Sequence, residues 1–124
     1  MKKGKPYEDS VASFLTSKGV KILKRNYRSR FGEIDLLGCY KTKKGEEVLL
    51  IVEIKGSSKN KNNLERIDCR KLKKLLLTVK KFLAENPHWE NKQIVFLGAD
   101  VFSKKVNLQK LFLEDCPQLG KYFL

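Results

Sequence analysis

The chain has 124 residues, of which 27 are Lys or Arg and 14 are Asp or Glu, so its formal net charge is +13. This length fits a single domain, expected over residues 1–124, and the hydrophobic fraction of 41% excludes a disordered basic tail because it supplies a core. The longest aliphatic run, Val48–Val52, is far shorter than the roughly 20 residues of a membrane helix, and no apolar segment follows the basic start as in a signal peptide. We therefore expect a cytoplasmic protein that does not insert into membranes.

Periodicity of apolar residues predicts the element order α-β-β-β-α-β. Residues 47–55 and 93–102 are apolar on both faces, which is typical of strands whose sheet is covered on both faces. A right-handed crossover through the helix between them makes these two strands parallel. The fold class is therefore α/β, with a mixed sheet covered by helices on both faces. Helices are expected over residues 6–18 and 64–85, strands over residues 20–28, 33–40, 47–55 and 93–102, a turn over residues 29–32, and an edge strand or a short helix over residues 106–113.

The cysteines and the histidine offer little for catalysis. Cys39, Cys69 and Cys116 are odd in number, far apart and in no C-x-x-C pair, which argues against a disulfide framework and against a structural zinc site. The single histidine, His88, follows the loop dipeptide Asn86-Pro87, so we expect it on the surface. Any chemistry must therefore rest on carboxylates and lysines.

Charged residues stand at one end of the apolar strand 47–55. Glu53 and Lys55 share a face of that strand, where an ion loses several kcal/mol of solvation unless it is paired or binds a metal. Hairpin pairing with the preceding strand would place Asp35 beside Glu53. Mg²⁺ or Mn²⁺ would relieve the repulsion between two carboxylates and activate water, and a nearby lysine would stabilise charge on a phosphate. These are the parts needed to cut a phosphodiester bond.

Each of these residues also has a structural interpretation. Glu8 lies at the margin of the apolar face of the first helix and could add a third acid, but an acid in a first turn also offsets the helix macrodipole. Glu53 and Lys55 could form a structural ion pair, and Asp35 could cap a turn. Asp100 is expected to be a turn residue at the end of the strand 93–102.

The spacing of Asp35, Glu53 and Lys55, D-x17-E-x-K, resembles the PD-(D/E)xK nuclease superfamily, whose restriction-endonuclease-like core runs α-β-β-β-α-β. More specific segments resemble the YraN-like family of predicted endonucleases over Gly4 to about Val101. They are Gly4-x-x-x-Glu8, Asn26-Tyr27-Arg28, Gly32-Glu33-Ile34-Asp35-Leu36, Val52-Glu53-Ile54-Lys55 and Lys71-Leu72. The family carries a basic residue shortly after the lysine of E-x-K, where this chain has Gly56-Ser57-Ser58.

The resemblance implies a divalent-metal site at Glu8, Asp35 and Glu53, with Lys55 as the catalytic lysine. It also implies that the region of Arg28 and Lys71 lies near the backbone of the substrate.

The net charge favours a polyanionic partner, nucleic acid by default, with an acidic protein or a membrane surface as the alternatives. Of the nucleic acids, we expect DNA in preference to RNA. Basic residues precede and follow the acidic site in sequence, and a solvated lysine face is the alternative for those on the helix. We expect a Mg²⁺- or Mn²⁺-dependent endonuclease acting on DNA, branched or damaged DNA included, with a non-catalytic nucleic-acid-binding module as the alternative. A homodimer would supply the two active sites that junction cleavage needs. The candidate nucleic-acid-binding residues are Arg28, Arg30, Lys71, Lys73 and Lys74, with Lys81 on the same helix and Lys59, Lys61 and Arg66 in the preceding loop.

Overall fold

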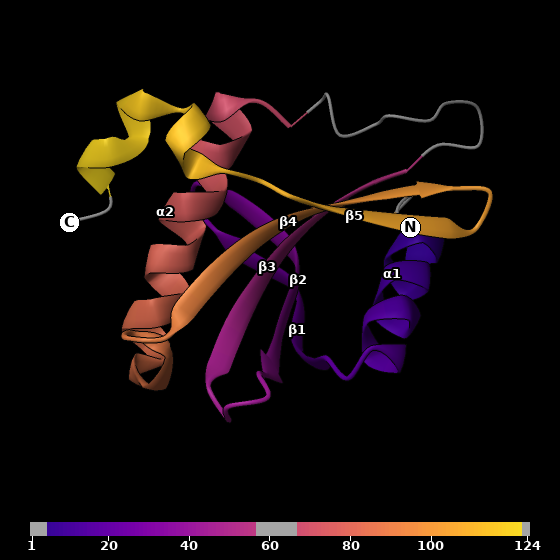
Figure 1. The fold of residues 1–124 in the computed structure, drawn as a ribbon. Coiled ribbons are helices and arrows are strands. Elements are labelled where there is room, and N and C mark those ends of the chain that lie inside the picture. The colour runs from indigo at the N-terminus through magenta and orange to yellow at the C-terminus, as the bar shows by residue number, and fades with distance from the viewer. Residues whose placement is uncertain (1–4, 57–66, 123–124) are drawn as a thin grey trace.

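The computed structural model describes residues 5–56 and 67–122, which form a twisted five-stranded sheet and two long helices (Figure 1). In chain order the elements are α1 (Lys5–Ser17), β1 (Lys21–Ser29), β2 (Gly32–Lys41), β3 (Glu47–Gly56), α2 (Cys69–Glu85), β4 (Gln93–Phe102) and β5 (Lys105–Lys110). Three short 3₁₀ helices are η2 (Pro87–Trp89), η3 (Leu113–Asp115) and η4 (Pro117–Tyr122). Ser57, Ser58 and the basic loop residues Lys59, Lys61 and Arg66 lie outside the described residues.

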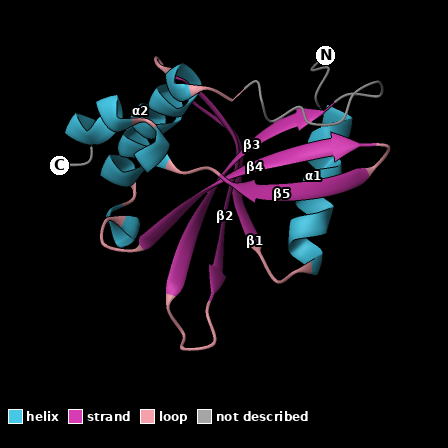
Figure 2. Ribbon diagram, turned by 45° about the horizontal axis from the view of Figure 1, so that its top comes forward, coloured by secondary structure: helices cyan, strands magenta, loops and turns pink. Residues whose placement is uncertain are grey.

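The strands follow chain order across the sheet, β1-β2-β3-β4-β5 (Figure 2). Neighbouring strands are antiparallel except β3 and β4, which are parallel and joined through α2. The mixed α/β class and the parallel pairing predicted from the sequence are therefore confirmed. Of the two alternatives for residues 106–113, the edge strand is correct, because β5 pairs with β4 through a tight turn at Ser103 and Lys104, both with positive φ.

Two buried clusters hold the helices to the strands. Alternate residues of a strand point to opposite faces, so Leu50 and Val52 of β3 join one cluster and Leu49 and Ile51 join the other. The α1 cluster contains Val11, Ala12, Leu15, Leu36, Val48, Leu50, Val52, Ala99 and Val101, and the α2 cluster includes Leu37, Leu49, Ile51, Leu72, Leu75, Val79, Phe82 and Phe96. Continuing the alternation places Glu53 on the same side as α2.

Both long helices end or begin at recognisable signals. α1 ends at Ser17, within one residue of the predicted end at residue 18, because Gly19 adopts a φ of +91° and Val20 N–H donates to the carbonyl of Leu15. The predicted start of the second helix is too early, because Ile67 and Asp68 are not helical. Asp68 is instead the N-cap, and its carboxylate accepts a hydrogen bond from the backbone N–H of Lys71 at 3.0 Å.

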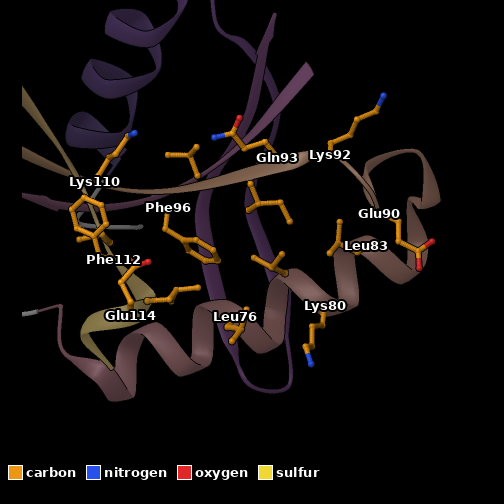
Figure 3. Close-up of a pocket in the computed structure, with 15 residues that line it drawn as sticks. Leu76, Lys80, Leu83, Glu90, Lys92, Gln93, Phe96, Lys110, Phe112 and Glu114 are labelled. Atoms are coloured by element: carbon orange, nitrogen blue, oxygen red, sulfur yellow. The ribbon is translucent and has the colours of Figure 1, made fainter. Parts of the chain in front are cut away.

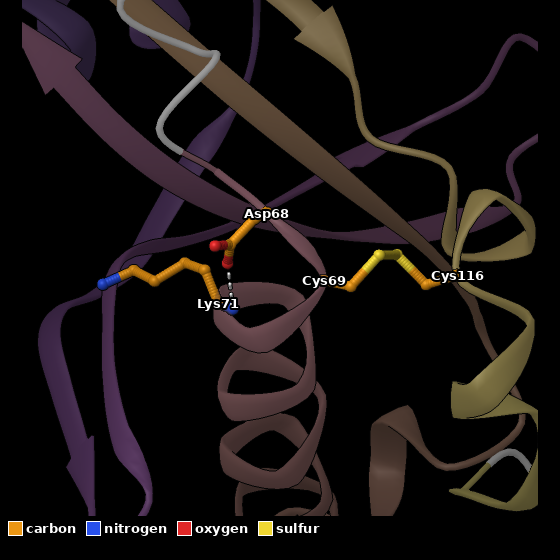
Figure 4. Close-up of a disulfide and its surroundings, with 4 residues drawn as sticks. All are labelled: Asp68, Cys69, Lys71 and Cys116. Carbon is orange, nitrogen blue, oxygen red and sulfur yellow. Dashed lines mark hydrogen bonds between the residues drawn. A yellow bond between two sulfur atoms is a disulfide. The ribbon is translucent and has the colours of Figure 1, made fainter.

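The expectation against disulfides is wrong, because Cys69 and Cys116 are bonded to each other (Figure 4). Cys69 is the first residue of α2, and Cys116 lies between η3 and η4. Their Cα atoms are 5.8 Å apart although 47 positions separate them in sequence, so only the return of the C-terminal segment across the start of α2 makes the bond possible. Cys39 is a free, half-buried thiol.

Candidate metal and nucleic-acid site

Asp35 lies where β2 and β3 stop pairing. The last backbone pair between these strands is Leu36 with Val52. One residue before Leu36, the side chain of Asp35 contacts β3 in place of the backbone. Its Oδ2 accepts a hydrogen bond from the backbone N–H of Ile54 at 2.7 Å. This bond fixes the half-buried carboxylate against β3, beside Glu53.

Glu53 is a buried acid with an incomplete set of partners. The residue is 3% exposed, and its carboxyl group lies within hydrogen-bonding reach of that of Asp35. Burial, then the hydrogen bond and the charge of Asp35, raise the pKa of Glu53 to about 8, against a smaller lowering by Lys71 and Lys55. Its Oε2 atom is buried and accepts no hydrogen bond within the described part of the chain. The arrangement therefore favours a proton or a cation between the two acids.

Lys71 forms an ion pair with that oxygen. Its Nζ lies 3.4 Å from Glu53 Oε2, an ion pair that spans from the first turn of α2 to β3 (Figure 4 shows the extended Lys71 side chain). The family resemblance implied that Lys71 lies near the substrate backbone and gave no sign of this ion pair. No local pattern signals it, because the contact depends on how α2 packs against the sheet.

Lys55 lies two residues beyond Glu53 on the same strand and lowers the pKa of Glu53 through its charge. Its partner in the β3–β4 register is Asp100. The expectation that Asp100 is a turn residue is wrong, since Asp100 lies inside β4 and is only 7% exposed. β4 extends beyond the apolar residues 94–97 to Phe102 and pairs with both β3 and β5, so Asp100 lies within the sheet. The structure thus brings Asp35, Glu53, Lys55 and Lys71 together at one end of β3.

Glu8 is buried, as its place at the margin of the apolar helix face suggests, but its contacts are with β1. Its Oε1 accepts a hydrogen bond from Asn26 Nδ2 at 3.2 Å and lies 3.6 Å from Arg25 Nη1. Among residues 5–56 and 67–122, no group of three or more His, Cys, Asp or Glu side chains is close enough to hold a metal ion. Glu8 therefore does not join Asp35 and Glu53 in such a group, and its role as a ligand stays a prediction.

The basic residues predicted to bind nucleic acid are divided between the β1–β2 hairpin and α2. Arg28 is exposed and its Nε lies 3.4 Å from Glu33 Oε1, and the Arg30 guanidinium lies over the ring of Phe31. Lys81 serves the fold, because its ammonium donates to the carbonyl of Arg28. Lys73 and Lys74 are both exposed on α2.

A hollow with a largely apolar lining lies elsewhere in the described part of the chain. A pocket of about 680 Å³ opens between α2, β4 and the segment after β5 (Figure 3). None of Asp35, Glu53, Lys55 or Lys71 lines it. It is lined by Leu76, Lys80, Leu83, Phe96, Phe112 and Glu114, among others. The candidate site is therefore separate from this hollow.

His88 lies on the surface of the protein, as predicted. The His88 side chain is 59% exposed and one ring nitrogen hydrogen-bonds Glu47 at 2.8 Å, which confirms its surface position. Within the residues that the structure describes, no helix has both the length and the apolar character needed to cross a membrane.

The model of a family described as "Uncharacterised protein family UPF0102" matches residues 7–103. The chain belongs to this family. A UPF0102 protein of Aquifex aeolicus is 37% identical over 107 residues, which are 86% of this chain and 98% of that protein. UPF0102 proteins of Campylobacter hominis and Thermotoga petrophila are 37% and 39% identical over 91 and 82 residues, which are 73% and 66% of this chain and 77% and 71% of those proteins.

Membership in UPF0102 confirms the YraN-like resemblance drawn from the sequence. The matched segment includes Glu8, the β1–β2 hairpin, Asp35, Glu53-x-Lys55 and Lys71. The site described above therefore lies within the part of the chain that defines the family.

Proposed function

We propose that this UPF0102 protein is a divalent-metal-dependent endonuclease acting on DNA, with a restriction-endonuclease-like fold. The α-β-β-β-α-β order, with β3 and β4 parallel, is consistent with that core. The two clusters, and the positions of α1 and α2 on either side of the strands in Figure 1, support a sheet covered by a helix on each face. The observation that carries the function is the pair of neighbouring acids, Asp35 and Glu53, with lysines beside them.

A hard divalent cation fits this pair. Two adjacent carboxylates cannot both ionise without cost, and the buried Glu53 Oε2 has no hydrogen-bond donor in the described chain. Mg²⁺ commonly uses one or two protein carboxylates and completes its shell with water and substrate phosphate. Asp35 and Glu53 would hold the ion, so the pair suffices without a third protein acid.

When bound, Mg²⁺ or Mn²⁺ would lower the pKa of a water molecule and neutralise charge on the scissile phosphate. Asp35 is held in place by its bond to Ile54, so its geometry does not depend on the ligand. Lys55 would stabilise charge that develops on the phosphate. The positive charge of Lys71 favours the ionised form of Glu53 that would bind the cation.

The test compares wild type with Asp35→Asn, Glu53→Gln and Lys55→Ala on linear, nicked, flapped and four-way DNA and on structured RNA, with Mg²⁺ or Mn²⁺. Cleavage of DNA by wild type and its loss in all three variants are expected, while DNA affinity holds or rises in the two acid variants because a charge that repels phosphate is gone. Asp9→Asn is the matched control, since Asp9 is an exposed acid paired with Arg25. Retained cleavage in Glu53→Gln would contradict the proposal.

One observation favours the non-catalytic DNA-binding module as second candidate. Lys71 already supplies a cation at 3.4 Å from Glu53 Oε2, so the acid pair is partly compensated without a metal. Wild-type protein that binds DNA with micromolar affinity or better but cuts no substrate under either metal would establish this alternative. A homodimer, as junction cleavage requires, stays a prediction that sedimentation with and without four-way DNA tests.

A further inference from the structure

The turn between β1 and β2 presents an aromatic ring to solvent on a strongly basic chain. Phe31 is 38% exposed, one of three large exposed hydrophobic residues in the described part of the chain. The guanidinium of Arg30 lies 4.9 Å from the centre of its ring, a cation–π arrangement. Tyr27, the other aromatic residue of this hairpin, is instead packed edge-on against Phe82 and bonded to Glu85, so it is committed to the fold.

Hydrogen bonds and close packing hold the β1–β2 turn against α2. Ser29 Oγ accepts the backbone N–H of Phe31 at 3.0 Å and shares a hydrogen bond of 2.7 Å with Thr78 Oγ1, which in turn donates to the carbonyl of Lys74. A Cβ on Gly32 would lie 3.4 Å from Lys74 Cβ, so the turn lies close against the helix there. Further along β1, Lys81 donates to the carbonyl of Arg28 at 2.8 Å. These contacts hold the turn in one conformation against α2, so the position of Phe31 is fixed.

A preorganised aromatic ring with an adjacent guanidinium matches the chemistry of unpaired bases. Bases stack on exposed aromatic side chains in a sequence-tolerant way, and arginine adds a cation–π contribution and a phosphate contact. In an intact duplex the base faces are already stacked on one another, so such a ring gains little there. Lys74, an exposed basic residue of α2, adjoins the hairpin at Gly32 and can contact the phosphate backbone, and Lys73 is exposed on the same helix.

We propose that Arg30 and Phe31 form a stacking platform for an unpaired base, so that the substrate is DNA with a single-stranded segment beside the cleaved bond. The assignment of the cleaved substrate rests on the proposed nuclease function, whereas the preference for binding unpaired DNA does not. Asp35 follows Phe31 by four residues along β2, or about 13 Å at roughly 3.3 Å per residue.

The binding test uses fluorescence anisotropy with single-stranded, flapped and blunt duplex DNA of equal length at one salt concentration. Phe31→Ala should weaken binding to single-stranded and flapped DNA by about 5- to 100-fold and binding to blunt duplex by less than about 2-fold. Phe31→Trp should retain the preference, and Phe112→Ala, which removes an exposed phenylalanine outside the hairpin, should change neither affinity. 2-Aminopurine at the unpaired position should be quenched by saturating wild type and much less by saturating Phe31→Ala.

Equal losses on duplex and single-stranded DNA, or no loss on either, would overturn the stacking platform. If Asp35→Asn and Glu53→Gln abolish cleavage while Phe31→Ala leaves substrate preference and cut position unchanged, the nuclease stands and the platform falls. If no cleavage occurs but Phe31→Ala selectively weakens binding to single-stranded DNA, the platform stands as part of a binding module and the nuclease proposal falls. Absence of DNA binding by wild type would overturn both.

Discussion

The carboxylate of Asp35 accepts a hydrogen bond from the backbone N–H of Ile54 at 2.7 Å, at the point where β2 and β3 cease to pair. A side chain thus satisfies a strand amide at a half-buried position, next to a buried second acid. Asp35 therefore contributes to the fold as well as to the proposed metal site, and substitutions there must be judged on both.

Removal of the Asp35 carboxylate should destabilise the protein. Asp35→Ala leaves the Ile54 N–H without its acceptor, which costs about 1–3 kcal/mol in the free energy of unfolding. Urea denaturation at pH 5, where Glu53 holds its proton, measures this cost with little charge repulsion between the two acids. Asp9→Ala is the control and should cost less than about 1 kcal/mol, because Asp9 forms an exposed ion pair with Arg25. Equal effects of the two substitutions would show that the Asp35–Ile54 bond is unimportant.

The metal-free protein should lose stability as the pH rises from about 4.5 to about 8. The pKa of Glu53 is raised from 4.5 to about 8 in the folded chain, so the folded state retains a proton that the unfolded state has released. This contribution is fully present below pH 4.5 and lost as the pH passes 8, a fall of roughly 2–5 kcal/mol. Glu53→Gln cannot titrate there and should show a flatter profile in EDTA. Parallel profiles for variant and wild type would contradict the assignment.

A side chain at position 56 should clash with the first helix. A Cβ on Gly56 would lie 2.6 Å from Cγ of Tyr7, so Gly56→Ala should destabilise by about 1–3 kcal/mol. In the Tyr7→Ala background most of that cost should vanish, which a double-mutant cycle by thermal denaturation measures. Gly32→Ala is the matched control, because its nearest neighbour, Lys74 Cβ, is 3.4 Å away. The contact with Tyr7 leaves no room for a side chain at position 56, directly after Lys55.

The Cys69–Cys116 bond should stabilise the C-terminal segment against the start of α2. Reductant, or Cys116→Ser, should lower the free energy of unfolding by about 2–4 kcal/mol, whereas Cys39→Ser should have a smaller effect. Alkylation of the unfolded, unreduced protein followed by mass spectrometry should label a single cysteine, Cys39. Three labelled cysteines would contradict the bond.

The basic face of α2 should contribute to DNA affinity through counterion release. Lys73→Gln with Lys74→Gln should lower the slope of log affinity against log salt by up to about two, since each lost phosphate contact removes about 0.9. Lys104→Gln with Lys105→Gln, in the β4–β5 turn, gives the comparison with equal loss of charge. If both pairs change the slope equally, the effect reflects net charge and not a surface on α2. Lys81 is excluded because its bond to Arg28 supports the hairpin.

Local patterns predicted most of the fold. The apolar stripe of α2, the doubly apolar β3 and β4 and the stop at Gly19 each arise from interactions within a few residues, so element order and class follow from the chain alone. The spacing of Asp35, Glu53 and Lys55 also indicated the candidate site, because a buried strand seldom carries uncompensated acids. The family followed from the same segments.

Tertiary structure decided the remaining contacts, all of which join residues remote in sequence. The bond from Asp35 to Ile54 depends on where β2 and β3 separate, and the ion pair of Lys71 with Glu53 depends on the packing of α2 against β3. Glu8 pairs with β1, and Cys116 reaches Cys69, for the same kind of reason. Periodicity determines which face of an element is buried, but the register of strands and the path of the chain between elements are set by packing of the whole core, and these place one side chain against another.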